Sequence, residues 1–302
     1  MKIFTGANKK RNILIGVVLL LIILSQLFMV KLIYAHKISG SPAKFLATLY
    51  QLKAGIVEDK SGDINIYLKD FITNKNFVSR LLDYQVNTDA NFANLDIKEQ
   101  EISDLVWNNL LKKAWLKKIA KENDIELTQE DIDYYINLVG GQDKLKEMVE
   151  TQGISLDEYK YFLIEQDILE AKVYDYLIAT FKDQEGVAKI QEAYAFLEAE
   201  NGKNWDDAVK KYTEDTRLSD NSFWLSEDEL INEYEAIKEI EEVGGFSKIV
   251  QSPIGYVIWH LDSISNSDEK NTREIRGLLI YAKSIDDFLA DYLSSVNIKR
   301  KY

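Results

Sequence analysis

The chain has 302 residues, 50 acidic against 37 basic side chains, a formal net charge of −13, two histidines and no cysteine. Without cysteine the chain has no disulfide framework and no thiol nucleophile, and the wide separation of His36 and His260 leaves no two-histidine metal motif, so we expect neither metal nor cofactor. An acidic chain without a basic, aromatic-rich stripe repels phosphate, which argues against nucleic acid as a partner.

An apolar segment follows the basic N-terminus. Ile13 to Val30 carries no charge and would form about 27 Å of helix, which is long enough to span a bilayer. Basic residues precede the segment, whereas only Lys31 follows it directly. The positive-inside rule therefore places the N-terminus in the cytoplasm and the rest of the chain outside the cell membrane. A signal peptide cleaved after Ala35 is the competing interpretation, but the long apolar core favours an uncleaved anchor.

The next part of the chain predicts a mixture of helix and strand. Residues 43–55 are predicted to form a helix that leads away from the membrane. Residues 63–68 alternate apolar and polar side chains, which is typical of a short strand. A helix is predicted over residues 68–84, and residues 87–95 form a looser stretch.

Residues 98–180 predict a compact set of antiparallel helices joined by short turns. The first helix covers about 98–123 and has a broad apolar face. Thr128 begins the second, and the glycine pair at 140–141 ends it. A third helix covers 143–152, and the capping box that begins at Ser155 opens a fourth helix, which runs to about residue 178.

Short helices and strands alternate beyond residue 181, which gives the whole chain an α+β fold that is mainly helical. Helices are predicted at 185–200, 205–212, 226–237 and 284–295, and strands at 256–261, 274–281 and 297–302. Residues 266–271 are a polar linker.

Four segments of this second half resemble, in order and spacing, the parvulin family of peptidyl-prolyl isomerases. They are NGKNWDDAVKKYTED at 201–215, FWLS at 223–226, VGGFSKIV at 243–250 and IGYVI at 254–258. The family patterns that they resemble are G-x-x-F-x-x-x-A-x-x-Y-S-x-D, G-W-F-S, L-x-x-G-x-(I/V)-S-x-(P/I)-V and F-G-Y-H-I.

Residues 107–176 are similar to the N-terminal helical chaperone domain of the SurA/PrsA-like folding factors. The matching segments are AKENDI at 120–125, TQEDI at 128–132 and GISLDEY at 153–159. The final helix and NIKRKY resemble the C-terminal segment that packs back on that domain. The resemblance implies four parts: an anchor at 1–35, a SurA-like domain at 36–180, a small parvulin-like α/β domain at 181–265, and a returning strand-helix-strand segment at 266–302.

The resemblance also implies where isomerase chemistry would lie. The family uses two histidines on adjacent strands and a nearby Cys or Asp, and Val257 stands at one histidine position. Two segments compete for the other position, one with Gly277 and one with Tyr176, and neither supplies histidine. Asp215 alone remains of the polar set, although it also fits an ordinary acid after a helix. His260 lies three residues from Val257, so a strand would turn it to the opposite face.

This sequence matches the apolar part of the family's site better than the polar part. Leu230 and Tyr234 stand where the family has Met and Phe, and Trp224 and Tyr256 are further candidates for contact with a peptide. Three functions follow: a membrane-anchored chaperone for unfolded or exported polypeptides that has lost isomerase activity, a working prolyl isomerase, and a non-catalytic scaffold or assembly factor. The two missing histidines favour the chaperone.

Overall fold

The computed structural model describes residues 5–88, 97–266 and 271–302, and for residues 5–20 and 266 it describes only the backbone. The predicted stretches at 87–95 and 266–271 therefore lie largely outside the described residues. Helices dominate the described part, and its strands form two small antiparallel sheets, which confirms the α+β, mainly helical prediction. The chain divides into a first unit, Met1–Leu169 with Asp291–Tyr302, and a second unit, Glu170–Ala290.

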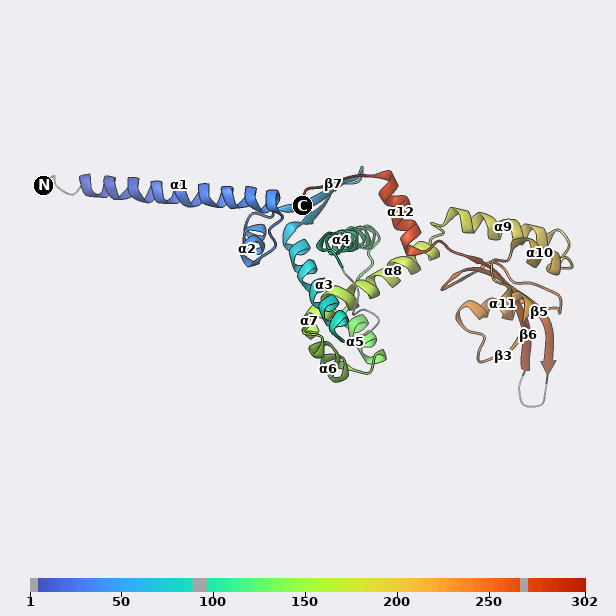
Figure 1. Ribbon diagram of the computed structural model, residues 1–302. Helices are drawn as coiled ribbons and strands as arrows, with labels where there is room; N and C mark the ends of the chain where they lie inside the picture. The colour runs from blue at the N-terminus through green and yellow to red at the C-terminus, as the bar shows by residue number, and fades with distance from the viewer. Residues whose placement is uncertain (1–4, 89–96, 267–270) are drawn as a thin grey trace. The chain divides into compact units, whose positions relative to one another are not determined.

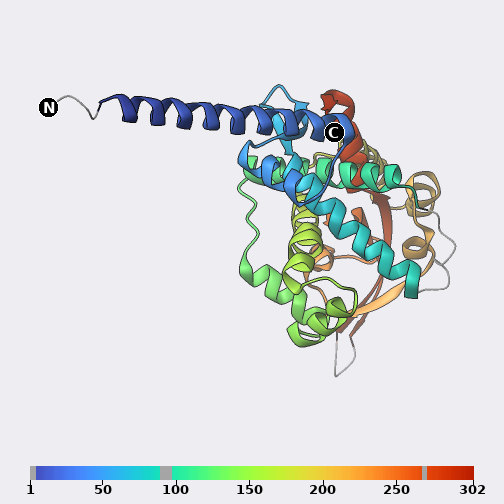
Figure 2. The same cartoon turned by 60° about the vertical axis from the view of Figure 1, so that its left-hand side comes forward.

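The N-terminal helix α1 (Thr5–His36) includes the segment predicted as a membrane anchor. Its last turn belongs to the core of the first unit, because Ile33 is buried there and Tyr34 Oη donates to the Lys53 carbonyl at 2.9 Å. The chain then bends by 116° into α2 (Ser41–Leu49) (Figure 2). Among the residues whose side chains are described, from Leu21 on, no single helix is long and apolar enough to span a membrane, whereas this bent pair together has the length and composition for one. The anchor stays a prediction.

A three-stranded antiparallel sheet, in the order β2-β1-β7, lies in the first unit. The central strand β1 (Lys53–Glu58) pairs with β2 (Ile64–Tyr67) and with β7 (Asn297–Arg300), so the C-terminal strand lies beside an early one (Figure 1). The helix predicted over 43–55 is wrong in its second half, because α2 ends at Leu49. The cause is a long-range pairing, which local periodicity does not reveal.

The helices of the first unit follow the predicted order. They are α3 (Leu68–Thr88), α4 (Glu99–Glu122), α5 (Gln129–Leu138), α6 (Gln142–Thr151) and α7 (Leu156–Tyr159). Thr128 and Ser155 cap α5 and α7 as predicted, each accepting at 3.2 Å from the backbone N–H three residues on. The predicted fourth helix contains a π-helical turn, Lys160–Ile164, between α7 and α8 (Glu165–Ala179). The core lies between the helices and the sheet and includes Phe71, Phe77, Trp107, Leu111 and Tyr302.

A four-stranded antiparallel sheet, in the order β3-β6-β5-β4, forms the centre of the second unit. Its strands are β3 (Phe223–Ser226), β4 (Val250–Ser252), β5 (Gly255–Asn266) and β6 (Asn271–Tyr281). Helices α9 (Gln184–Glu198) and α10 (Trp205–Tyr212) cover one face of it (Figure 1). Because β6 bonds to β3 on one side and to β5 on the other, it belongs to this sheet and not to a separate C-terminal segment.

The remaining elements of the second unit are short. They are α11 (Thr216–Asp220), the 3₁₀ turns Asn232–Glu239, and the first half of α12 (Ile285–Ser295), whose residues from Asp291 on belong to the first unit and lead to β7. The helix predicted from Ser226 to about residue 237 is wrong at its start. Ser226 ends β3, and its backbone N–H donates to the Glu229 carboxylate at 2.8 Å, which closes a turn instead of opening a helix.

Candidate functional site

Val257 and Gly277, two of the positions at which the resemblance predicts the family's histidines, lie on adjacent strands in the second unit. Strands β5 and β6 pair so that Trp259 stands opposite Gly277 and Val257 stands opposite Leu279. A Cβ atom built on Gly277 would lie 3.2 Å from Cγ2 of Val257. Tyr176, the other candidate, lies in the helix α8. Of the two competing segments, only the one with Gly277 forms a strand beside Val257.

The space in front of Gly277 holds an aromatic ring. Trp259 is 2% exposed, and its Cζ3 would lie 2.7 Å from a Cβ atom on Gly277. The indole N–H donates to the Glu233 carbonyl at 2.8 Å, and the ring contacts Tyr234 and Phe223 at centroid distances of 5.1 and 6.0 Å. Val257 and Gly277 therefore face hydrocarbon, and neither carries a side chain that could move a proton.

Asp215 is held as an anion by its neighbours. It precedes α11, and its carboxylate accepts from the backbone N–H and the side-chain Nε of Arg217 at 2.9 and 3.0 Å and from Tyr281 Oη at 2.6 Å. The Arg217 guanidinium and the Tyr281 hydroxyl hold the pKa of the Asp215 carboxyl well below its usual range. Such a carboxylate stays ionised at neutral pH and positions the start of α11; it does not serve as a general acid. Sequence reasoning missed Arg217 and Tyr281, and only the Asp-x-Arg spacing signals the first of them.

The four predicted peptide-binding residues divide between the two faces of the sheet. Leu230 is fully buried, and Tyr234 is half-buried, on the face that contains Trp259. Tyr256 is fully buried on the other face, where burial raises its pKa to about 12 and its hydroxyl lacks a described hydrogen-bond partner. Trp224 alternates with Phe223 along β3, so it points to that second side, and it is 48% exposed. The four side chains do not form one surface, and Trp224 alone offers a large exposed area.

His260 lies on the opposite face of β5 from Val257. Its ring stacks on Trp205 at a centroid distance of 4.5 Å, and its Nδ1 lies 2.8 Å from Oδ1 of Asp262. Asp262 in turn accepts from Nε and Nη2 of Arg276 at 2.7 and 2.9 Å. Burial lowers the pKa of His260, and the Asp262 carboxylate opposes this only in part. The arrangement is that of a buried, neutral core histidine.

This histidine predicts an acid-sensitive fold. Because the pKa of His260 is lower in the folded chain than its unfolded value of about 6.5, the unfolded chain binds more protons below that pH. The free energy of unfolding should therefore fall as pH is lowered from about 7 to about 5. Urea unfolding across this range should show a flatter profile for His260→Gln than for the native chain. Equal slopes in the two chains would refute the assignment.

The described side chains contain no cluster of possible metal ligands. Within 5–88, 97–266 and 271–302, no three His, Cys, Asp or Glu side chains are grouped so that they could hold a metal ion. Neither a protein-family model nor a curated protein matches the chain.

Proposed function

We propose that this chain is a membrane-anchored, extracytoplasmic folding factor that binds unfolded or proline-containing segments of exported polypeptides and does not isomerise them. Ile13 to Val30 would anchor it in the cell membrane, with the N-terminus in the cytoplasm. The helices of the first unit would correspond to the SurA-like chaperone domain, and the second unit to a degenerate parvulin-like domain.

One observation carries the proposal. Rotation about an X–Pro bond has a barrier of about 18 to 20 kcal/mol, and lowering it requires polar groups that favour the twisted amide. Val257 and Gly277 lie on adjacent strands, where the family resemblance expects two histidines, and Trp259 fills the space between them and Tyr234. A prolyl peptide bond placed there would meet carbon atoms, so the arrangement supports a domain without catalysis.

Exposed apolar side chains of the second unit support the binding role. Trp224, Ile231 and Ile254 are 48, 57 and 48% exposed. Such side chains bind extended polypeptides by burial of apolar area, and a tryptophan loses little side-chain entropy on binding. Trp224 is therefore the residue on which the binding proposal is best tested.

The test combines two assays on the full chain in detergent solution. In a protease-coupled assay with a proline peptide, we expect no turnover above the uncatalysed rate. In a light-scattering assay, the chain should suppress aggregation of an unfolded client at near-stoichiometric ratio, and Trp224→Ala should weaken this suppression. Tyr134→Ala, a change at an exposed aromatic residue of the first unit, is the matched control.

Each alternative function has its own outcome. Turnover above the uncatalysed rate that is lost in Asp215→Asn would establish a working isomerase and overturn the proposal. Absence of both turnover and suppression would also overturn it, in favour of a scaffold that holds one partner permanently.

A further inference from the structure

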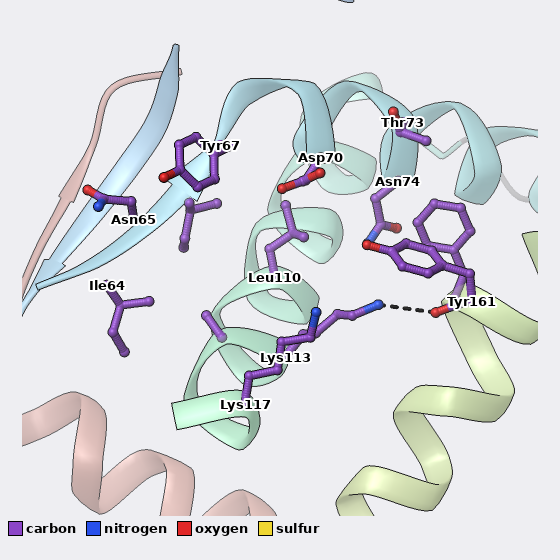
Figure 3. A pocket seen from close by; sticks show the side chains of 13 residues that line it. Ile64, Asn65, Tyr67, Asp70, Thr73, Asn74, Leu110, Lys113, Lys117 and Tyr161 are labelled. Atoms are coloured by element: carbon purple, nitrogen blue, oxygen red, sulfur yellow. Dashed lines mark hydrogen bonds between the residues drawn. The ribbon is translucent and has the colours of Figure 1, made fainter. Parts of the chain in front are cut away.

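A cavity of about 340 Å³ lies in the first unit between β2, α3, α4 and the π-helical turn (Figure 3). Its wall is mainly apolar and aromatic, with Ile64, Tyr67, Leu110, Ala114, Tyr161 and Phe162 among the lining residues. This volume is at the lower end of the range for sites that hold small organic ligands. The cavity is therefore large enough for a short apolar group.

A buried lysine ammonium lies in this apolar wall. Lys113 is 8% exposed, and its Nζ donates to the Tyr161 carbonyl at 3.1 Å and lies 3.9 Å from the centroid of the Tyr161 ring (Figure 3). Among the described residues no carboxylate forms an ion pair with it. A buried charge is costly unless it is paired, and burial lowers the pKa of Lys113 to about 8. The ammonium is thus still mostly protonated at neutral pH. Its N–H groups that do not bond to the Tyr161 carbonyl can donate to a ligand.

The other charges of the lining leave the cavity cationic. Lys117, one turn further along α4, lines the same space, and Asp70 on α3 is the carboxylate among the described lining residues. Glu165, which lies outside the lining, and Asp70 both raise the pKa of Lys113 through their charges, but neither makes a hydrogen bond to it. Within the lining itself, two cations stand against one anion, which favours an anionic ligand.

The π-helical turn gives an independent sign of function. Lys160–Ile164 interrupts an otherwise α-helical run and carries Tyr161 and Phe162, which line the cavity beside Lys113. Turns of this kind widen a helix at some cost in stability and occur frequently at functional sites. The chain thus keeps both a π-helical turn and an unpaired buried cation at one place.

We propose that this cavity binds a carboxylate carried on an apolar group, with the carboxylate against the Lys113 ammonium and the apolar group against the aromatic wall. Two sources have this chemistry: the free C-terminus of a polypeptide that ends in an apolar residue, and a fatty acid. The inference stands apart from the proposed function, because small probes test it without a folding client.

The test is calorimetric titration of the full chain in detergent with two pairs of probes. One pair is N-acetyl-Leu-Leu with a free carboxylate and the same dipeptide as its amide; the other is hexanoate and hexanamide. A hydrogen bond to a charged group predicts that a carboxylate binds about tenfold or more tightly than its amide. Lys113→Met should remove this preference, whereas Lys121→Met, at an exposed position of α4, should keep it.

The outcomes decide both the proposal and the source. A preference in the dipeptide pair alone supports a polypeptide C-terminus, and one in the hexanoate pair alone supports a fatty acid. Equal binding of carboxylate and amide in both pairs, no binding of any probe, or a preference that survives Lys113→Met would overturn the proposal. If Lys113→Met does not fold, Lys113→Gln replaces it, and the comparison within the native chain still decides.

Discussion

Replacing Trp259 by alanine is expected to lower the free energy of unfolding of the second unit by about 3 to 5 kcal/mol. The indole is 2% exposed, and it packs against Gly277, Tyr234 and Phe223, so its removal leaves a cavity that neighbouring side chains can fill only in part. The change also leaves the Glu233 carbonyl without its 2.8 Å donor. Hydrogen exchange at the amides of β5 and β6 would report the loss in this unit.

Trp224 provides the matched control for this prediction. It is a tryptophan of the same sheet, on β3, but it is 48% exposed, so Trp224→Ala should change the unfolding free energy by no more than about 0.5 kcal/mol. The two variants should therefore separate packing from binding: Trp259→Ala affects stability, and Trp224→Ala affects client binding. A loss below about 1 kcal/mol for Trp259→Ala would show that the ring does not fill the site and would remove the main argument against catalysis.

Features that depend on neighbours in sequence could be predicted. The caps at Thr128 and Ser155 and the amphipathic helices of the first unit follow from side-chain identity three or four residues apart, and the structure has them where expected. Strand β1 could not be predicted, because its pairing with Asn297–Arg300 joins segments at opposite ends of the chain. Strand β3 was missed for a similar reason, since it is short and pairs with the distant β6.

The candidate sites, too, could be predicted only in part from the spacing of residues in the sequence. Sequence spacing offered Gly277 and Tyr176 as alternatives beside Val257, and only the pairing of β5 with β6 decides between them. That Trp259 fills the space in front of Gly277 depends on side-chain packing, which no spacing rule gives. Lys113 occurs within the apolar face of α4, a weak sign of burial, but the cavity beside it is made by three other elements.

The second large effect is expected at Gly55, in the central strand of the sheet in the first unit. A Cβ atom there would lie 2.2 Å from Cη2 of Trp107 and 2.7 Å from the backbone oxygen of Lys299. Trp107 is 6% exposed, so its ring has little room to move, and a backbone oxygen cannot rotate away. Gly55→Ala should therefore destabilise this unit by about 3 kcal/mol, the upper end of the usual cost of overpacking.

Hydrogen exchange tests this prediction inside one molecule. Amides of β1 and β7 should exchange faster in Gly55→Ala, whereas those of β5 and β6 in the second unit should keep their native rates. Adding Trp107→Phe removes the ring atoms nearest to the new methyl group, so the double variant should lose less stability than the sum of the single losses. Additive losses would mean that the Lys299 carbonyl, and not the indole, sets the cost. Unchanged exchange in β1 and β7 would contradict the close approach of three chain segments at Gly55, on which the attachment of the C-terminal strand depends.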